Sequence, residues 1–170
     1  TLPDEIWKNM AQMVKTELPE CDYFISGPDR CFAENSESKM FCWLRDSYGY
    51  DIREVQDMMH LEGEQIMKIA VYHQERCEEL CAPVFTPYWK DKINLAAAGK
   101  EWMDSTPPEG EKSIAVEFIR QRLGISLEET CTFGDNLNDI AMLRKAGMSY
   151  AVANARAEVQ AAARKVCPSY

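Results

Sequence analysis

Residues 132–143 read TFGDNLNDIAML, and this stretch decides the fold class that we predict. A short β-rich run over Thr130–Phe133 leads into a polar loop, and the apolar spacing beyond it predicts a helix over Asp139–Ala146. The pattern continues on both sides, with a helix expected over Lys112–Leu123 and a strand over Met148–Val152. Alternating helices and strands are typical of a parallel sheet covered by helices, so we expect an α/β fold here.

The loop within this stretch is rich in polar side chains. It carries Gly134, two aspartates (Asp135 and Asp139) and two asparagines (Asn136 and Asn138). In open α/β sheets, ligands bind at the carboxyl ends of the strands, which is where this loop lies. Two carboxylates there suit a hard divalent cation such as Mg²⁺, which prefers oxygen ligands. The alternative is an Asx-rich turn that only caps the next helix, because Asn and Asp favour both turns and helix N-termini.

Lys112 opens a helix directly after the segment PPEG at residues 107–110, which is the strongest domain-boundary signal in the chain. A lysine at a helix start is ordinarily solvated, and the helix dipole slightly disfavours a cation there. A function for Lys112 is therefore indicated only by the motifs that follow it in the sequence. Along the helix we expect one apolar side to face inward, formed by Ala115, Phe118, Ile119 and Leu123.

Residues 1–106 follow a different pattern, which is typical of a mixed α+β unit. We expect helices over Tyr50–Met59 and Glu75–Leu80 and a β-hairpin around Gly99. Most of the chain's net charge of −9 lies in this first part. The sequence therefore predicts two domains, one over residues 1–106 and one over residues 107–170.

Composition and charge exclude several classes of protein. The chain is acidic and has no basic run, which argues against nucleic-acid binding, because phosphate contacts supply most of that affinity. No apolar run approaches the roughly 18–20 residues that span a bilayer, so we expect no membrane partner. Seven scattered cysteines without a CxxC pair, with only His60 and His73 as imidazoles, argue against zinc and fit a reducing cytoplasm.

Together the motifs resemble the haloacid dehalogenase-like (HAD) superfamily, and in particular its Cof-type sugar-phosphate phosphatases. In that branch a lysine opens the helix before a GD-x-x-ND loop, and a segment with an NA pair follows. The resemblance covers residues 110–163. The matching features here are Lys112, Gly134-Asp135 with Asn138-Asp139, and Ala151–Ala155 followed by Val159 and Ala162.

The resemblance implies a fold, an activity and a set of site residues. The fold would be α/β, with the C-terminal part of a Rossmann-like HAD core at residues 107–170 and an α+β cap of C2 type at residues 1–106. The activity would be Mg²⁺-dependent hydrolysis of a small phosphorylated metabolite, such as a sugar phosphate. Of the site residues, Asp135 would bind Mg²⁺, Asp139 would support or bind the same ion, Asn138 would help to position the phosphate, and Lys112 would neutralise charge on the transferred phosphoryl group.

Two departures from the family pattern change these expectations. Ser113 stands where the branch commonly has glycine after the lysine. The DxD motif, which supplies the aspartate nucleophile, is absent from the sequence, and the chain begins at Thr1 rather than Met. We therefore expect that an N-terminal half of the core is missing and that the chain alone does not complete the phosphatase cycle. Apolar faces and a sheet edge would be uncovered, to be completed by the missing core segment or by a second copy in a homo-oligomer.

Two other functions stay open. A truncated homologue would be a non-catalytic module that binds Mg²⁺, a phosphosugar or a protein partner without hydrolysis. The second function is phosphotransfer to an acceptor other than water, which the motifs do not distinguish from hydrolysis.

Overall fold

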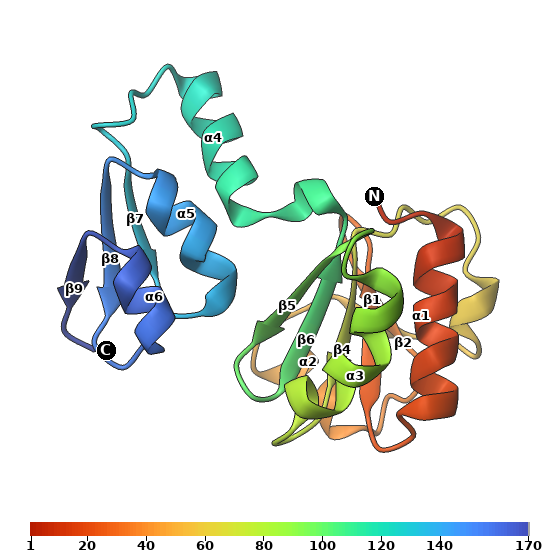
Figure 1. Ribbon diagram of the computed structural model, residues 1–170. Coiled ribbons are helices and arrows are strands. Elements are labelled where there is room, and N and C mark those ends of the chain that lie inside the picture. Colours follow the sequence, from red (N-terminus) through yellow and green to blue (C-terminus); the bar gives the residue numbers. More distant parts are fainter. Residues whose placement is uncertain (170) are drawn as a thin grey trace. The chain divides into compact units, whose positions relative to one another are not determined.

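The computed structural model describes residues 1–169 and divides the chain into two compact units (Figure 1). Unit 1 is Thr1–Pro108 and unit 2 is Glu109–Tyr170. Each has its own sheet and its own buried cluster. A short 3-10 turn, η2 (Pro108–Gly110), lies where the division falls.

Unit 1 is built on a six-stranded sheet in the order β3-β2-β1-β4-β6-β5. Neighbouring strands run antiparallel, except β2 and β3, which are parallel. Gly99 joins β5 to β6 with a φ of +80°, a backbone conformation that glycine adopts without strain. The strands are β1 (Asp22–Ser26), β2 (Cys31–Ala33), β3 (Ile52–Glu54), β4 (Lys68–Tyr72), β5 (Asn94–Ala98) and β6 (Trp102–Thr106).

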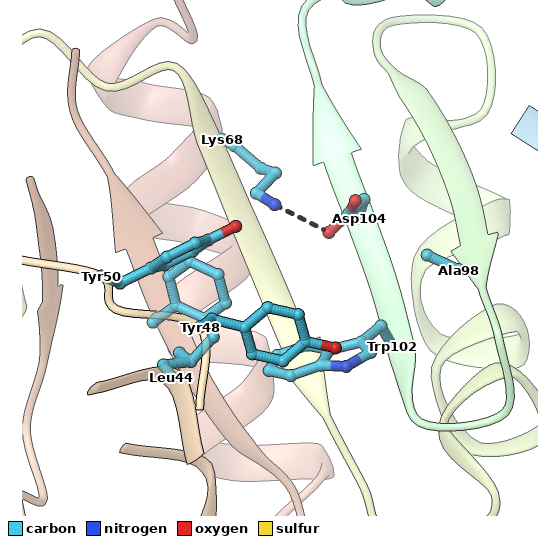
Figure 2. Close-up of a pocket in the computed structure, with 8 residues that line it drawn as sticks. Leu44, Tyr48, Tyr50, Lys68, Ala98, Trp102 and Asp104 are labelled. Carbon is cyan, nitrogen blue, oxygen red and sulfur yellow. Dashed lines mark ion pairs between the residues drawn. The ribbon is translucent and has the colours of Figure 1, made fainter. Parts of the chain in front are cut away.

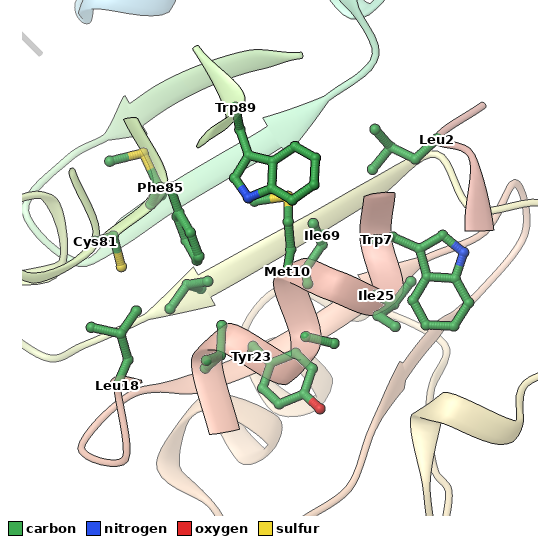
Figure 3. Packing of buried hydrophobic residues seen from close by; sticks show 14 of the residues in the cluster. Leu2, Trp7, Met10, Leu18, Tyr23, Ile25, Ile69, Cys81, Phe85 and Trp89 are labelled. Carbon is green, nitrogen blue, oxygen red and sulfur yellow. The ribbon is translucent and has the colours of Figure 1, made fainter. Parts of the chain in front are cut away.

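Helices pack against both faces of this sheet, since successive residues of a strand point to opposite sides. Ile25 and Ile69 belong to the larger buried cluster, which α1 and α3 complete (Figure 3). Phe24 and Ala70, on the opposite face, belong to a second cluster that α2 completes. These elements are α1 (Asp4–Glu17), α2 (Lys39–Asp46), the 3-10 turn η1 (Met58–His60) and α3 (Cys77–Trp89).

The helix expected over Tyr50–Met59 is wrong. This segment forms β3 and then η1. The backbone of Ile52 pairs with Cys31 of β2, so a parallel strand replaces the helix that the apolar spacing suggested. Pairing with a neighbouring strand depends on tertiary context, which local spacing does not report.

The helix expected over Glu75–Leu80 is much longer in the structure. It continues as α3 to Trp89, through Pro83 and Pro87. A proline inside a helix removes one hydrogen bond and crowds the preceding turn. The helix persists because its buried side chains recur every fourth residue and pack into the core of unit 1; they are Cys77, Cys81, Phe85 and Trp89.

Unit 2 contains a three-stranded parallel sheet in the order β7-β8-β9. Leu143 of α5 and Val159 of α6 pack with Ala151 of β8 in its buried cluster, and α4 packs against α5. The elements are α4 (Lys112–Leu123), β7 (Cys131–Gly134), the 3-10 turn η3 (Leu137–Asp139), α5 (Ile140–Lys145), β8 (Met148–Val152), α6 (Ala157–Ala162) and β9 (Lys165–Cys167).

The apolar side of α4 faces outward, which contradicts the inward orientation expected for it. Phe118, Ile119 and Leu123 are 62%, 54% and 65% exposed, and Ala115 is also exposed. Ser113, on the other side of the helix, is buried. The helix α5 packs against α4 on the side that carries Ser113, whose hydroxyl accepts a hydrogen bond from Lys145 of α5. Within residues 109–169, no element of unit 2 covers the apolar side.

No helix among residues 1–169 is both long enough and apolar enough to cross a membrane.

Candidate active site

The candidate site lies at the carboxyl end of β7, where Gly134 ends the strand and the turn η3 follows. A Cβ on Gly134 would lie 2.6 Å from the Cβ of Asp139, so glycine is the residue that permits this close approach. The side chain of Asn136 accepts a hydrogen bond from the Leu137 N–H at 2.8 Å and caps η3. The loop therefore combines a capped turn with a cluster of acidic side chains.

Asp139 is the buried centre of this loop, with only 3% of its surface exposed. Its Oδ1 atom pairs with the Nζ atom of Lys112. Its Oδ2 atom accepts hydrogen bonds from the backbone N–H groups of Asp135 and Asn136, at 3.0 and 3.2 Å. Burial opposes ionisation of this carboxyl, but the hydrogen bonds from Lys112 and the two amides outweigh it and lower the pKa of Asp139 below its ordinary value. Asp139 is thus an ionised carboxylate whose two oxygens are both engaged.

Lys112 extends from the first turn of α4 toward the loop. Its ammonium also donates to the Oδ1 atom of Asn138, at 3.4 Å, and its side chain is half exposed. The structure therefore brings Lys112 into contact with Asn138 and Asp139, which follow it by 26 and 27 positions in the sequence.

A second contact holds the start of α4, and the sequence did not reveal it. The buried hydroxyl of Ser113 accepts a hydrogen bond from Lys145 of α5 at 2.9 Å and donates one to Glu111 at 2.9 Å. The sequence marked Ser113 only as a departure from a family pattern. The contact with Lys145 depends on how α5 packs against α4, for which no local signal exists.

Asp135 differs from Asp139 in being exposed. Its backbone N–H binds Asp139, whereas its carboxylate has no hydrogen-bond or ion-pair partner among residues 1–169. No group of three or more His, Cys, Asp or Glu side chains in that range is placed to hold a metal ion. Mg²⁺ typically takes one or two protein carboxylates and completes its shell with water and substrate oxygens. Asp135 fits this mode of binding, because its carboxylate is the one in the loop that no residue among 1–169 engages.

Comparison with curated proteins finds relatives that are considerably longer than this chain. A phosphoglycolate phosphatase from Archaeoglobus fulgidus is 47% identical over 58 residues, which is 34% of this chain and 26% of that protein. An HMP-PP phosphatase from Cronobacter sakazakii is 26% identical over 113 residues, which is 64% of this chain and 40% of that protein. The chain spans about half the length of the curated relatives over which it matches most extensively.

Solved structures match nearly the whole chain. A crystal structure of a protein from Eubacterium rectale is 51% identical, with a TM-score of 0.80, and the match covers 98% of this chain and 63% of that one. A sugar phosphatase of HAD subclass IIB is 21% identical, with a TM-score of 0.78, over 98% of this chain and 62% of that one. These neighbours confirm the fold class expected from the sequence.

The family model described as haloacid dehalogenase-like hydrolase matches residues 1–170. The resemblance drawn from Lys112 and the GDNLND loop is confirmed by this match. The chain belongs to the haloacid dehalogenase-like hydrolases.

Proposed function

We propose that the protein to which this chain belongs is a Mg²⁺-dependent phosphatase acting on a small phosphorylated metabolite, a sugar phosphate in particular. The observation that carries the proposal is one loop in which the buried carboxylate of Asp139 binds both the ammonium of Lys112 and the backbone N–H of Asp135, whose own carboxylate has no partner among residues 1–169. The phosphatase names of the relatives and the sugar phosphatase among the structural neighbours support it.

In this proposal the residues of unit 2 divide the work of phosphoryl transfer. When bound, Mg²⁺ neutralises charge on the phosphoryl oxygens. Asp135 holds the ion, and Asp139 supports the site by fixing both the loop backbone and Lys112. Lys112 binds a phosphoryl oxygen, and Asn138 orients Lys112 and the phosphate. Positioning and charge stabilisation provide most of the rate enhancement in this class of reaction.

The nucleophile of the proposed reaction is an aspartate outside these 170 residues, which would form a phospho-aspartate. Unit 1 would act as the cap that selects the leaving group. The alternative, a non-catalytic module that binds Mg²⁺ without turnover, makes the same prediction for metal binding and differs in the activity of the longer protein.

Titration of the 170-residue chain with Mg²⁺, followed by urea unfolding, tests the metal assignment. A bound ion stabilises the folded state by about 1.4 kcal/mol at ten times its dissociation constant. We expect wild type to be stabilised in a saturable way and Asp135→Asn to lose this response. Asp91→Asn removes an exposed carboxylate of unit 1 and serves as the matched control, which should respond as wild type does.

Hydrolysis of an aryl phosphate with Mg²⁺ tests the catalytic assignment. We expect no turnover by the 170-residue chain and turnover by a longer chain that carries the DxD motif, abolished there by Lys112→Ala. Turnover by the 170-residue chain that Asp135→Asn removes would contradict an external nucleophile. A longer chain that binds Mg²⁺ but turns nothing over would favour the non-catalytic module.

A further inference from the structure

Three thiols meet at one end of unit 1, where β1 and α3 begin. Cys21 directly precedes β1, and Cys77 and Cys81 lie in the first two turns of α3. Asp22 of β1 pairs with Tyr72 of β4, and the chain runs from the end of β4 into α3, so these starts lie side by side. All three thiols belong to the larger buried cluster or pack against it (Figure 3).

The thiols lie on the sheet face that α1 and α3 cover. The opposite face carries a pocket that is lined by Tyr50, Lys68, Trp102 and Asp104, among others (Figure 2). None of the three cysteines lines that pocket, so chemistry at the thiols is separate from any role of unit 1 in selecting a leaving group.

Cys81 is the common partner of the other two thiols. Its Sγ atom lies 3.7 Å from the Sγ atom of Cys77, one turn earlier in α3. It also forms a hydrogen bond with the thiol of Cys21. The Cys77 thiol is engaged elsewhere, because it donates to the carbonyl oxygen of Val71 at 3.1 Å. Two disulfides therefore compete for Cys81, one with Cys77 and one with Cys21.

Helix geometry favours the bond with Cys21. A disulfide needs Cβ atoms about 3.5–4.5 Å apart, whereas residues i and i+4 of a helix hold theirs about 5–6 Å apart. A bond between Cys77 and Cys81 would therefore distort the first turns of α3. Cys21 lies outside the helix, so a bond from Cys21 to Cys81 leaves the helical spacing unchanged.

Cys21 is also the thiol that a reagent in solution reaches first. It is partly exposed, whereas Cys77 and Cys81 are fully buried. The hydrogen bond from Cys81 outweighs burial and the negative charges of Glu20 and Asp22, and it lowers the pKa of Cys21 below its ordinary value. A lowered pKa increases the fraction of thiolate, which is the reactive form. Cys21 is thus suited to attack first and Cys81 to attack second.

We propose that Cys21 and Cys81 form a reversible redox pair, which a small-molecule disulfide such as oxidised glutathione converts to an intramolecular disulfide. The Cys21 thiolate attacks one sulfur of the reagent, whose S–S bond breaks and releases one glutathione thiolate. The Cys81 thiol then loses its proton, and its sulfur attacks Cys21 in the mixed disulfide and releases the second glutathione. The protons of both cysteines pass to the two glutathione thiolates. Two protein thiols are thereby oxidised, and one glutathione disulfide is reduced.

Peptide mapping of the natively folded 170-residue chain tests the pair. The chain is incubated with oxidised glutathione, free thiols are alkylated, and the product is digested without reduction and analysed by mass spectrometry. Endoproteinase Glu-C cleaves after the glutamates at positions 78 and 79, which separates Cys77 from Cys81. We expect a peptide pair joined through Cys21 and Cys81, which dithiothreitol returns to two free thiols.

Variants of single cysteines locate the bond. Cys21→Ser should leave Cys81 a free thiol, and Cys81→Ser should stop at a glutathione adduct of Cys21. Cys77→Ser should keep the bond. The matched control is Cys42→Ser, which removes a partly exposed thiol of unit 1 that donates to the Ser36 carbonyl, and it should also keep the bond. Because Cys21 is partly exposed, Cys21→Ser keeps the experiment valid if Cys81→Ser fails to fold.

Three results would overturn the proposal. They are a bond between Cys77 and Cys81 in wild type, a glutathione adduct of Cys21 that persists in wild type, and free thiols at Cys21 and Cys81 while Cys131 carries glutathione. Cys131 is an exposed thiol of unit 2, so its reaction shows that the oxidant was active. Neither Mg²⁺ binding nor turnover is measured, so the outcome is independent of the proposed function.

Discussion

Asp139 holds two parts of unit 2 together through one carboxylate. One oxygen holds Lys112 at the start of α4, and the other holds the backbone of residues 135 and 136 after β7. A buried charge is costly unless it is paired and hydrogen-bonded, and here both oxygens are satisfied. Removing this charge should therefore disturb the helix start and the loop together.

Asp139→Asn should destabilise the chain by about 1–3 kcal/mol, because buried donors lose a charged acceptor. The lowered pKa of Asp139 also gives a pH dependence. Its contribution is present above the unfolded pKa of about 3.9 and is lost as the pH falls through the folded pKa. In urea unfolding measured from pH 7 to pH 3, the free energy of unfolding should fall less steeply for Asp139→Asn than for wild type.

The control for this measurement is Asp135→Asn, which removes from the same loop an exposed carboxylate that has no partner among the 169 residues that the structure describes. Its stability without metal should stay within about 0.5 kcal/mol of wild type. Equal destabilisation by Asp139→Asn and Asp135→Asn would mean that the contacts of the Asp139 carboxylate do not stabilise the fold.

Gly134→Ala tests the close approach of β7 to Asp139. The added methyl would lie 2.6 Å from the Cβ of Asp139 and must push it away, at a cost of about 1–3 kcal/mol. Gly27→Ala is the comparison, because there the nearest atoms lie at 3.5 Å, an ordinary contact distance. If Gly134→Ala and Gly27→Ala had the same urea midpoint, the loop after β7 would have moved to accommodate the methyl group at no cost.

The sequence predicted which residues lie together better than it predicted their individual contacts. Motif spacing marked Lys112, Asn138 and Asp139, and the structure places them together. It did not indicate that Asp139 would bind the backbone amides that precede it in the loop, or that Lys145 would reach Ser113. Those contacts arise from a tight turn and from helix packing, neither of which a local pattern encodes.

At the scale of elements, hydrophobic periodicity predicted the bounds of α4 well and its orientation poorly. The expected and observed bounds of α4 agree, because its spacing and the closing Gly124, with a φ of +67°, are local signals. Its apolar side is nevertheless exposed. Periodicity identifies which residues share a side, but the direction of that side depends on which other elements are present.

A pair of matched substitutions tests this orientation. Leu143→Ala removes a buried side chain of α5 and should cost about 2–5 kcal/mol. Leu123→Ala makes the same chemical change on the exposed side of α4 and should cost less than about 1 kcal/mol, mainly from small differences in helix propensity. A large loss of stability in Leu123→Ala would mean that α4 packs through its apolar side in solution.

At the scale of the whole molecule, the two units have very different cores. Unit 1 buries large side chains on both faces of its sheet, among them Trp7, Phe24 and Phe85. The buried cluster of unit 2 consists of Leu143, Ala151 and Val159. Since buried apolar area supplies most of the free energy of folding, unit 2 should be the less stable of the two.

Hydrogen exchange followed by mass spectrometry measures this difference directly. We expect amides of β1 and β4 to be protected far longer than those of β7 and β8, because local unfolding is easiest where few apolar contacts are buried. A single exchange rate for both sheets would contradict this and would indicate that the chain unfolds as one cooperative body.

The pairing of Lys112 with Asp139 also bears on the order in which ligands arrive. An ammonium that already neighbours a carboxylate presents almost no net charge to an incoming anion, although its remaining N–H groups stay free to bind one. In the proposed function, attraction of a phosphate would then come from a cation held by Asp135. In the proposed phosphatase, the metal would therefore bind before the anion.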